Sequence, residues 1–179
     1  EIDYGAFTGN VNAKMIKNLG AKYIILGHSE NRANGDTDII INKKINSALK
    51  QKLTVIFCIG ETLAQKKRKE TNRIIRKQIT QGLKGFKKNS RIIIAYEPVW
   101  SIGTGIIPKN HELEKNIKFI NSTISKNTKL KKIKVLYGGS VNPKNIQSFN
   151  AINILDGYLI GGASQNAKKL IDIVSKSYN

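Results

Sequence analysis

RIIIAYEPVWSIGTG, residues Arg91–Gly105, is the stretch from which the fold of this chain is inferred. Its first part, Arg91–Tyr96, is a short β-branched apolar run, which predicts a strand buried on both faces. Glu97 follows this strand, and Pro98 prevents the strand from continuing. An acid at the end of a buried strand, followed by an apolar loop with glycines, indicates a catalytic base beneath a movable lid. A solvated Glu at a strand-to-loop junction is the alternative interpretation.

The same pattern recurs along the chain: a short apolar strand, a polar or glycine-rich turn, and an amphipathic helix. The predicted strands are Ala21–Gly27, Leu53–Ile59, Arg91–Tyr96, Ile133–Tyr137 and Asp156–Ile160. The predicted helices are Val11–Leu19, Asp38–Gln51, Thr62–Leu83, Asn110–Ser125, Pro143–Phe149 and Ala167–Ser177. Because polar groups follow each strand, the pattern predicts a parallel α/β fold of about five βα units with ligands at the carboxyl ends of the strands. Both a barrel and an open doubly wound sheet fit, and the lack of a G-x-G-x-x-G turn favours the barrel.

Length and composition are those of an ordinary globular chain. Its 179 residues and 19.9 kDa predict a single domain over residues 1–179. No apolar run reaches membrane-spanning length and no signal-peptide pattern is present, so no membrane partner is expected. Cys58 is the single cysteine and cannot form an intrachain disulfide, which favours a reducing, cytoplasmic location.

The formal net charge of +19 raises the question of a nucleic-acid partner. The basic residues are, however, scattered through almost every predicted helix, and no alternation of aromatic and basic residues is visible. We therefore expect the charge to reflect solvated surfaces, with no nucleic-acid partner.

Further polar residues follow other predicted strands. His28 comes directly after one strand and precedes a short segment that could begin a helix, whose positive end would favour the neutral imidazole. A hydrogen-bonded structural histidine is the alternative. Gly138-Gly139-Ser140 and Gly161-Gly162 form two glycine turns after consecutive strands, and such turns in barrels commonly bind phosphate through backbone N–H groups. One Cys and two separated His offer no metal-ligand spacing, so no metal site is predicted.

Several motifs resemble those of the triosephosphate isomerase family, in order and over essentially the whole chain. They are GAFTG at Gly5–Gly9, YIILGHSENR at Tyr23–Arg32, CIGET at Cys58–Thr62, AYEPVWSIGTG at Ala95–Gly105, YGGSVN at Tyr137–Asn142 and LIGGAS at Leu159–Ser164. The resemblance implies a TIM (β/α)8 barrel and a cofactor-free isomerase of glycolysis and gluconeogenesis. Its substrates would be glycerone phosphate and D-glyceraldehyde 3-phosphate, interconverted by proton transfer through an enediolate.

The resemblance also implies roles for individual residues. Glu97 would be the proton acceptor, and His28 would be the neutral electrophile that polarises the carbonyl. Ser29 would hold Glu97 in its resting position, and Thr8 would project into the partner subunit of a homodimer. The residues implied to bind the substrate phosphate are Gly103, Ser140, Gly161 and Gly162.

One family feature is not found in this sequence. A segment resembling G-N-W-K, which supplies an Asn and a Lys to the substrate, does not occur in the 179 residues. A complete barrel has eight strands and about 250 residues. We therefore expect a partial barrel, a C-terminal fragment preceded by roughly 70 residues with three strands, and expect the fragment to be inactive alone. The alternatives are a non-catalytic fragment or another phosphate-binding barrel such as an aldolase, for which no Schiff-base lysine is visible at a strand end.

Overall fold

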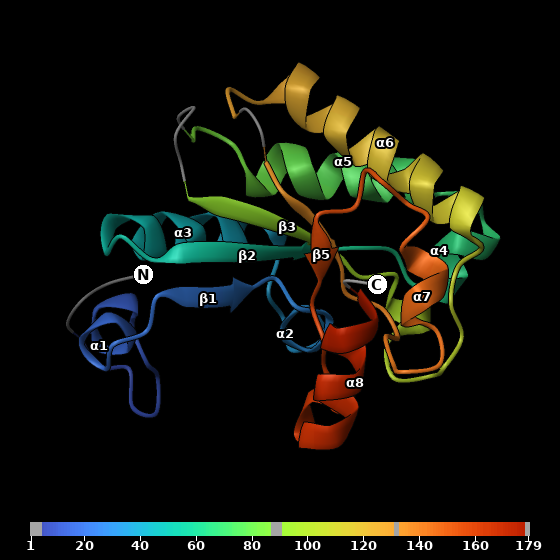
Figure 1. The fold of residues 1–179 in the computed structure, drawn as a ribbon. Coiled ribbons are helices and arrows are strands. Elements are labelled where there is room, and N and C mark those ends of the chain that lie inside the picture. Colours follow the sequence, from blue (N-terminus) through green and yellow to red (C-terminus); the bar gives the residue numbers. More distant parts are fainter. Residues whose placement is uncertain (1–4, 87–90, 131–132, 178–179) are drawn as a thin grey trace.

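A computed structural model describes residues 5–86, 91–130 and 133–177, drawn in Figure 1. Its strands are β1 (Tyr23–Leu26), β2 (Thr54–Ile59), β3 (Ile92–Tyr96), β4 (Val135–Tyr137) and β5 (Gly157–Tyr158). Its α-helices are α1 (Ala13–Asn18), α2 (Ser29–Ala33), α3 (Asp38–Lys50), α4 (Leu63–Lys67), α5 (Thr71–Gly82), α6 (Asn110–Asn127), α7 (Ile146–Phe149) and α8 (Ala167–Ser177). Two 3-10 turns, η1 (Val99–Ser101) and η2 (Gly162–Gln165), complete these elements.

The order of the strands separates the two predicted architectures. Within the described residues, five parallel strands form one sheet in the order β1-β2-β3-β4-β5, so each strand pairs with the next one in the sequence. A doubly wound sheet would instead reverse its strand order at a switch point. Consecutive parallel pairing with helical crossovers is the arrangement of a (β/α)8 barrel, and the predicted partial barrel with five strands is confirmed.

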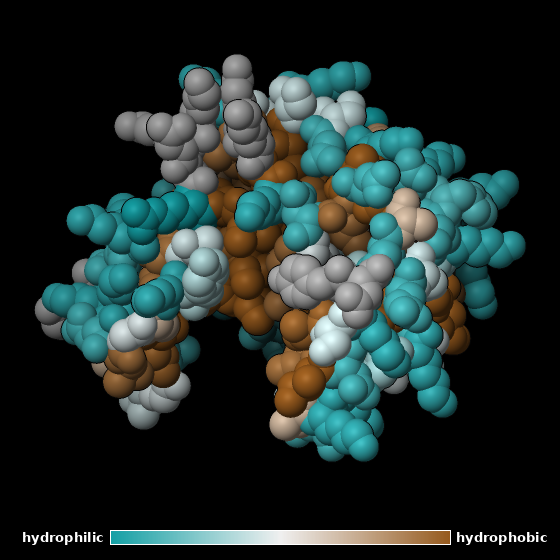
Figure 2. Space-filling view, viewed as in Figure 1, coloured by the Kyte–Doolittle hydropathy of each residue, from teal (hydrophilic) through white to brown (hydrophobic). Residues whose placement is uncertain are grey.

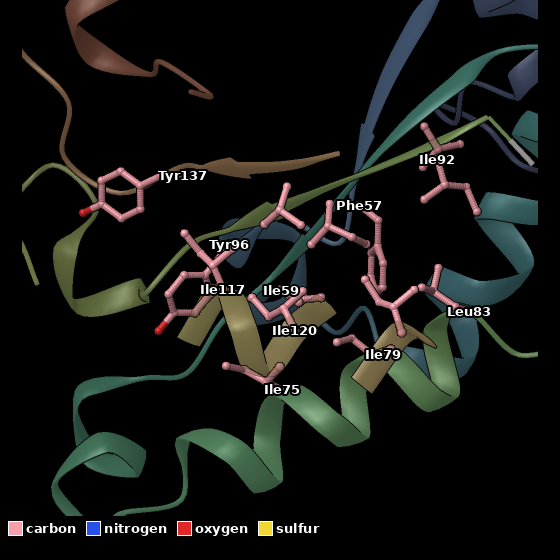
Figure 3. Packing of buried hydrophobic residues seen from close by; sticks show 14 of the residues in the cluster. Phe57, Ile59, Ile75, Ile79, Leu83, Ile92, Tyr96, Ile117, Ile120 and Tyr137 are labelled. Atoms are coloured by element: carbon pink, nitrogen blue, oxygen red, sulfur yellow. The ribbon is translucent and has the colours of Figure 1, made fainter. Parts of the chain in front are cut away.

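The main core lies between the sheet and helices α3, α5 and α6, which lie along one side of it in Figure 1. Alternate strand residues point towards these helices, as the two-residue period of a strand requires. From the sheet they are Val55, Phe57, Ile59, Ile92, Ile94, Tyr96, Val135 and Tyr137, all buried. Figure 3 shows Phe57, Ile59 and Tyr96 meeting Ile75, Ile79 and Ile120 of the helices. The apolar stripes read from the helical period thus form this core.

The opposite face of the sheet is partly open. On the edge strand β1, Tyr23 is 59% exposed and Ile25 is 47% exposed. Figure 2 shows hydrophobic surface in the hollow between the region of α1 and the region of α8. In a closed barrel the residues on this side of the strands fill the interior in layers.

The prediction of one long helix is wrong, because the structure has two shorter helices there. The sequence predicts one helix over Thr62–Leu83, but α4 ends at Lys67 and α5 begins at Thr71. Between them Lys69 adopts a positive φ of 58°, a conformation that interrupts an α-helix. The reason is visible in the sequence, because the apolar stripe begins only at Ile74 and nothing apolar holds the basic residues 66–69 against the sheet.

Candidate active site

A cavity of about 700 Å³ opens at the carboxyl ends of the strands. Its lining includes the residues predicted from the sequence to act on or bind the substrate: His28, Glu97, Gly103, Ser140, Gly161 and Gly162. These residues come from four different βα loops, and the parallel sheet brings them together because its strands end at one edge. The cavity has two chemically distinct ends, one carrying Glu97 and His28 and the other carrying the glycine turns.

Glu97 is held firmly at its position. It follows β3 directly, is 3% exposed, and its backbone N–H donates to the carbonyl of Ile59 at 2.7 Å. Two glycines leave room for it: a Cβ on Gly138 would lie 2.6 Å from Cγ of Glu97, and a Cβ on Gly60 would collide with the Glu97 carbonyl oxygen. Neither glycine can therefore be replaced without moving the acid or its backbone.

The surroundings of Glu97 change its acidity. Burial disfavours the carboxylate and raises the pKa of Glu97 to about 7. The neighbouring His28 and Cys58 act in the opposite direction and moderate the rise. A carboxyl group with a pKa near neutrality can both accept and return a proton, as a general base requires.

His28 caps the short helix that follows β1. Its Nδ1 accepts a hydrogen bond from the backbone N–H of Glu30 at 3.4 Å, while its Nε2 lies 3.8 Å from Oε1 of Glu97. Since Nδ1 acts as the acceptor, a neutral imidazole carries its proton on Nε2, on the side of Glu97. The helix start predicted after His28 is confirmed as α2.

Arg32 ties the histidine loop to the neighbouring strand. Its guanidinium donates to the carbonyl oxygens of Gly27 at 2.7 Å and of Cys58 at 3.1 Å, and it pairs with Asp38 at 2.7 Å. These partners lie just after β1, in β2 and at the start of α3. The side chains of Arg32 and Asp38 are 18% and 9% exposed, so the pair fixes the loop in partly desolvated surroundings.

The predicted lid, residues 99–105, forms the turn η1 and then a glycine-containing tip. Ser101 is fully buried, and its hydroxyl donates to the Ile106 carbonyl at 2.6 Å and lies 2.8 Å from the hydroxyl of Tyr137. It also accepts from the N–H of Ser140 at 3.3 Å, which joins this segment to the turn after β4. Gly103 at the tip is exposed and has a φ of +68°, a conformation that glycine adopts freely.

The glycine turn after β5 offers backbone donors to the cavity. A Cβ placed on Gly161 or Gly162 would meet no atom within 4 Å. Within the described residues, the N–H groups of Gly161 and Gly162 donate to no protein acceptor. Unpaired N–H groups beside open space suit an anion that approaches the backbone closely.

Some residues around the cavity were not anticipated from the sequence. Cys58 adjoins Glu97 and lowers its pKa, whereas Ser29, which was expected to hold this acid, begins α2 and makes no hydrogen bond to it in the described part of the chain. Burial and the neighbouring Glu97 raise the pKa of the Cys58 thiol, which keeps it protonated. Lys144 and Lys169 also line the cavity. They went unnoticed because basic residues occur throughout this chain.

The comparisons with known proteins agree with this architecture. A family model described as Triosephosphate isomerase matches residues 1–177. Triosephosphate isomerase of Thermodesulfovibrio yellowstonii is 42% identical over 173 residues, covering 95% of this chain and 70% of that protein. The chain belongs to the triosephosphate isomerase family. The enzymes of Dictyoglomus turgidum and Mycoplasma mobile are 43% and 42% identical to this chain. Both matches cover 95% of this chain, and they cover 71% of the first enzyme and 69% of the second.

Membership of the triosephosphate isomerase family makes the cavity the candidate active site of an isomerase. The chain spans about 70% of the length of the relatives it matches. Among the described residues, no group of three or more His, Cys, Asp or Glu is arranged to hold a metal ion. In the same residues, no helix is both long and apolar enough to cross a membrane.

Proposed function

We propose that this chain carries the base and the electrophile of a triose-phosphate isomerase acting on glycerone phosphate and D-glyceraldehyde 3-phosphate. One observation carries the proposal: Nε2 of His28 lies 3.8 Å from Oε1 of Glu97 at one end of a cavity whose other end presents backbone N–H groups that donate to no acceptor among the described residues. This spacing supports the proposal, because a base and a hydrogen-bond donor so close together can act on adjacent atoms of one small substrate.

Each side chain has a defined part in the reaction. Glu97 removes a proton from the carbon beside the carbonyl and returns it to the former carbonyl carbon, while the proton of the neighbouring hydroxyl passes to the former carbonyl oxygen. The two transfers together convert ketose into aldose. His28 donates from Nε2–H to the carbonyl oxygen and supports the negative charge of the enediolate. The pKa of Glu97, raised by burial to about 7, matches a group that gains and loses a proton in one turnover.

The opposite end of the cavity holds the phosphate. Gly161 and Gly162 contribute N–H groups, while Gly103 and Ser140 border the same space from the lid and from the turn after β4. Backbone donors at a glycine turn bind phosphate oxygens without a side chain standing in the way. The phosphate would anchor the substrate with its reacting carbons towards Glu97.

The remaining features follow the family. The proposed protein works as a homodimer, with the Gly5–Gly9 loop at the subunit contact, and it acts in the cytoplasm in glycolysis and gluconeogenesis. The single cysteine, buried and without a disulfide, suits a reducing compartment. Sedimentation of the purified protein measures its oligomeric state directly.

The test is isomerase activity in two proteins. One is residues 1–179 alone, and the other is the same chain joined after the N-terminal part of the Thermodesulfovibrio yellowstonii relative, which would supply the Asn-Lys segment. In whichever protein is active, Glu97→Gln should lower kcat by about 10²–10⁴-fold, because general base catalysis is lost. Glu114→Gln, a half-exposed glutamate on α6, is the matched control and should leave kcat unchanged. Equal activity of the two Gln variants would disprove the assignment.

The pH profile gives an independent test. Protonated Glu97 cannot accept a proton, so kcat/KM should fall about tenfold for each pH unit below its pKa. The fall should begin near pH 7, where burial places the pKa of Glu97. The phosphate of the substrate loses its second proton at about pH 6, so its titration can be distinguished from that of Glu97. A kcat/KM that stays constant between pH 6 and pH 8 would contradict this role for Glu97.

A further inference from the structure

The start of the lid is held by buried polar groups. Trp100, in η1, donates its indole N–H to Oε1 of Glu61 at 2.9 Å. The other oxygen of Glu61 accepts from the hydroxyl of Tyr96 at 3.1 Å, and Tyr96 in turn accepts from the amide of Asn116 at 2.9 Å. Glu61 is 1% exposed, so these bonds replace its lost hydration. They fix one edge of the Trp100 ring.

The face of the same ring is covered by a cation. Nζ of Lys66 lies 3.7 Å from the centroid of Trp100 and 2.7 Å from Oε1 of Glu112. The side chains of Lys66 and Glu112 are 29% and 33% exposed, so both are partly desolvated. An ammonium over an aromatic face is attracted to the ring, and the carboxylate keeps the flexible lysine in that position.

The local fold explains why these groups meet. A capping box between Thr62 and Gln65 starts α4 directly after Glu61, and this short helix places Lys66 in its last turn. Glu112 lies in the first turn of α6, the helix that follows the lid. Lys66 of α4 therefore lies over the ring of Trp100, and Glu112 at the start of α6 holds this lysine.

We propose that Lys66 is a positioning residue that holds Trp100 and thereby sets the position of the lid over the anion end of the cavity. Trp100 lies three residues after Glu97 and three residues before Gly103, and both neighbours line the cavity. A displacement of Trp100 would therefore shift both Glu97 and Gly103. The identity of the anion as a triose phosphate rests on the proposed function, whereas the role of Lys66 in holding Trp100 does not.

The single tryptophan makes the proposal directly measurable. Trp100 is the only tryptophan of the chain, so the fluorescence of the whole protein reports on the lid. Lys66→Met removes the charge and keeps most of the side chain, and Lys66→Arg restores a cation that can lie over the ring. Glu112→Gln keeps Lys66 but removes its ionic partner. Lys118→Met is the matched control, because Lys118 pairs with Glu114 elsewhere on α6 at 2.6 Å.

The experiment measures fluorescence anisotropy and acrylamide quenching of Trp100, with and without glycerol 3-phosphate as an unreactive anion. Lys66→Met should lower the anisotropy, increase the quenching and weaken glycerol 3-phosphate binding about two- to fivefold, the range expected for one lost cation–π contact. Lys66→Arg should restore all three quantities, and Glu112→Gln should change them in the same direction as Lys66→Met but less. Lys118→Met should match the parent protein.

Two results would overturn the proposal. One is an unchanged Trp100 anisotropy and anion affinity in Lys66→Met. The other is a loss of thermal stability in Lys66→Met and Glu112→Gln with no change in Trp100 mobility, because that result describes a purely structural contact. If Lys66→Met does not fold, Glu112→Gln decides in its place. Absence of isomerase activity in the parent protein would reject the proposed function alone, since the fluorescence measurements do not depend on turnover.

Discussion

The two ends of the cavity are built in different ways. At the proton-transfer end, Glu97 is 3% exposed and its side chain lies against Gly138, with no space for another carbon atom. At the phosphate end, Gly161 and Gly162 are exposed, and added carbons there would meet open space. Proton transfer depends on a carboxyl group whose pKa is set by its buried surroundings, so its side chain is tightly packed. Anion binding depends on backbone N–H groups, and the space beside them is left open for the ligand.

This difference predicts opposite consequences for one substitution. Replacement of Gly by Ala adds the same methyl group at either end. At Gly138 the methyl group meets Glu97, so it disturbs the protein itself. At Gly162 it meets no protein atom, so it disturbs only a ligand. The pair of variants therefore separates the protein's packing from its binding.

Gly138→Ala should have the largest effect. The added Cβ would lie 2.6 Å from Cγ of Glu97, so the acid must move into the cavity. A displacement of about 1 Å at a catalytic group can reduce the rate about 100-fold, and kcat should fall by that order. The free energy of unfolding should decrease by about 1–3 kcal/mol, as for other overpacked sites. Steady-state kinetics and urea denaturation measure the two quantities.

A result in which Gly138→Ala keeps full kcat would show that Glu97 tolerates displacement and that the tight packing has no catalytic importance. Gly20→Ala is unsuitable as a control because Gly20 has a φ of +88°. Gly162 serves instead as the control for the free energy of unfolding, since its φ lies outside the left-handed region and its Cβ direction is open.

Gly162→Ala should affect binding and leave the fold intact. Its free energy of unfolding should stay within about 0.5 kcal/mol of the parent value. Affinity for glycerol 3-phosphate should fall about tenfold, because a Cβ keeps the anion from the backbone N–H and weakens one charge-assisted hydrogen bond. Isothermal calorimetry measures the affinity. Unchanged affinity would mean that the phosphate does not lie against Gly162.

Much of the fold follows from the sequence because its signal is local. Each strand is a short β-branched run, and each is followed by a helix with an apolar stripe, so the βα order can be read without tertiary information. The choice of a barrel over a doubly wound sheet needed the strand order, which depends on pairing between distant segments. The break in the helix over Thr62–Leu83 was missed because lysine and arginine have high helix propensity wherever they stand.

The candidate site was predictable to the extent that its residues carry a recognisable motif. His28 and Glu97 stand at strand ends, and the parallel sheet gathers such positions at one edge. The partners that set their geometry were not predictable in this way. Cys58 of β2 adjoins Glu97, which follows β3, and Lys66 of α4 lies over Trp100 of η1 although the two are distant in sequence. Such contacts depend on three-dimensional packing and leave no periodic pattern.

The smallest expected effect concerns two lysines at the phosphate end. Lys144 and Lys169 line the cavity and are both exposed, so each should attract a phosphate dianion through a screened Coulomb interaction. Lys144→Gln and Lys169→Gln should each lower kcat/KM about twofold at low ionic strength, and the loss should disappear near 0.5 M salt, where the Debye length is about 4 Å. Lys168→Gln is the matched control, because Lys168 adjoins Lys169 but does not line the cavity.

If the net charge of +19 attracts substrate from every direction, all three variants should lose the same small fraction of kcat/KM. An effect confined to Lys144 and Lys169 would show instead that the position of the charge matters. The phosphate end would then combine backbone donors with local side-chain charge, and the contrast between the two ends would be one of burial more than of chemical group.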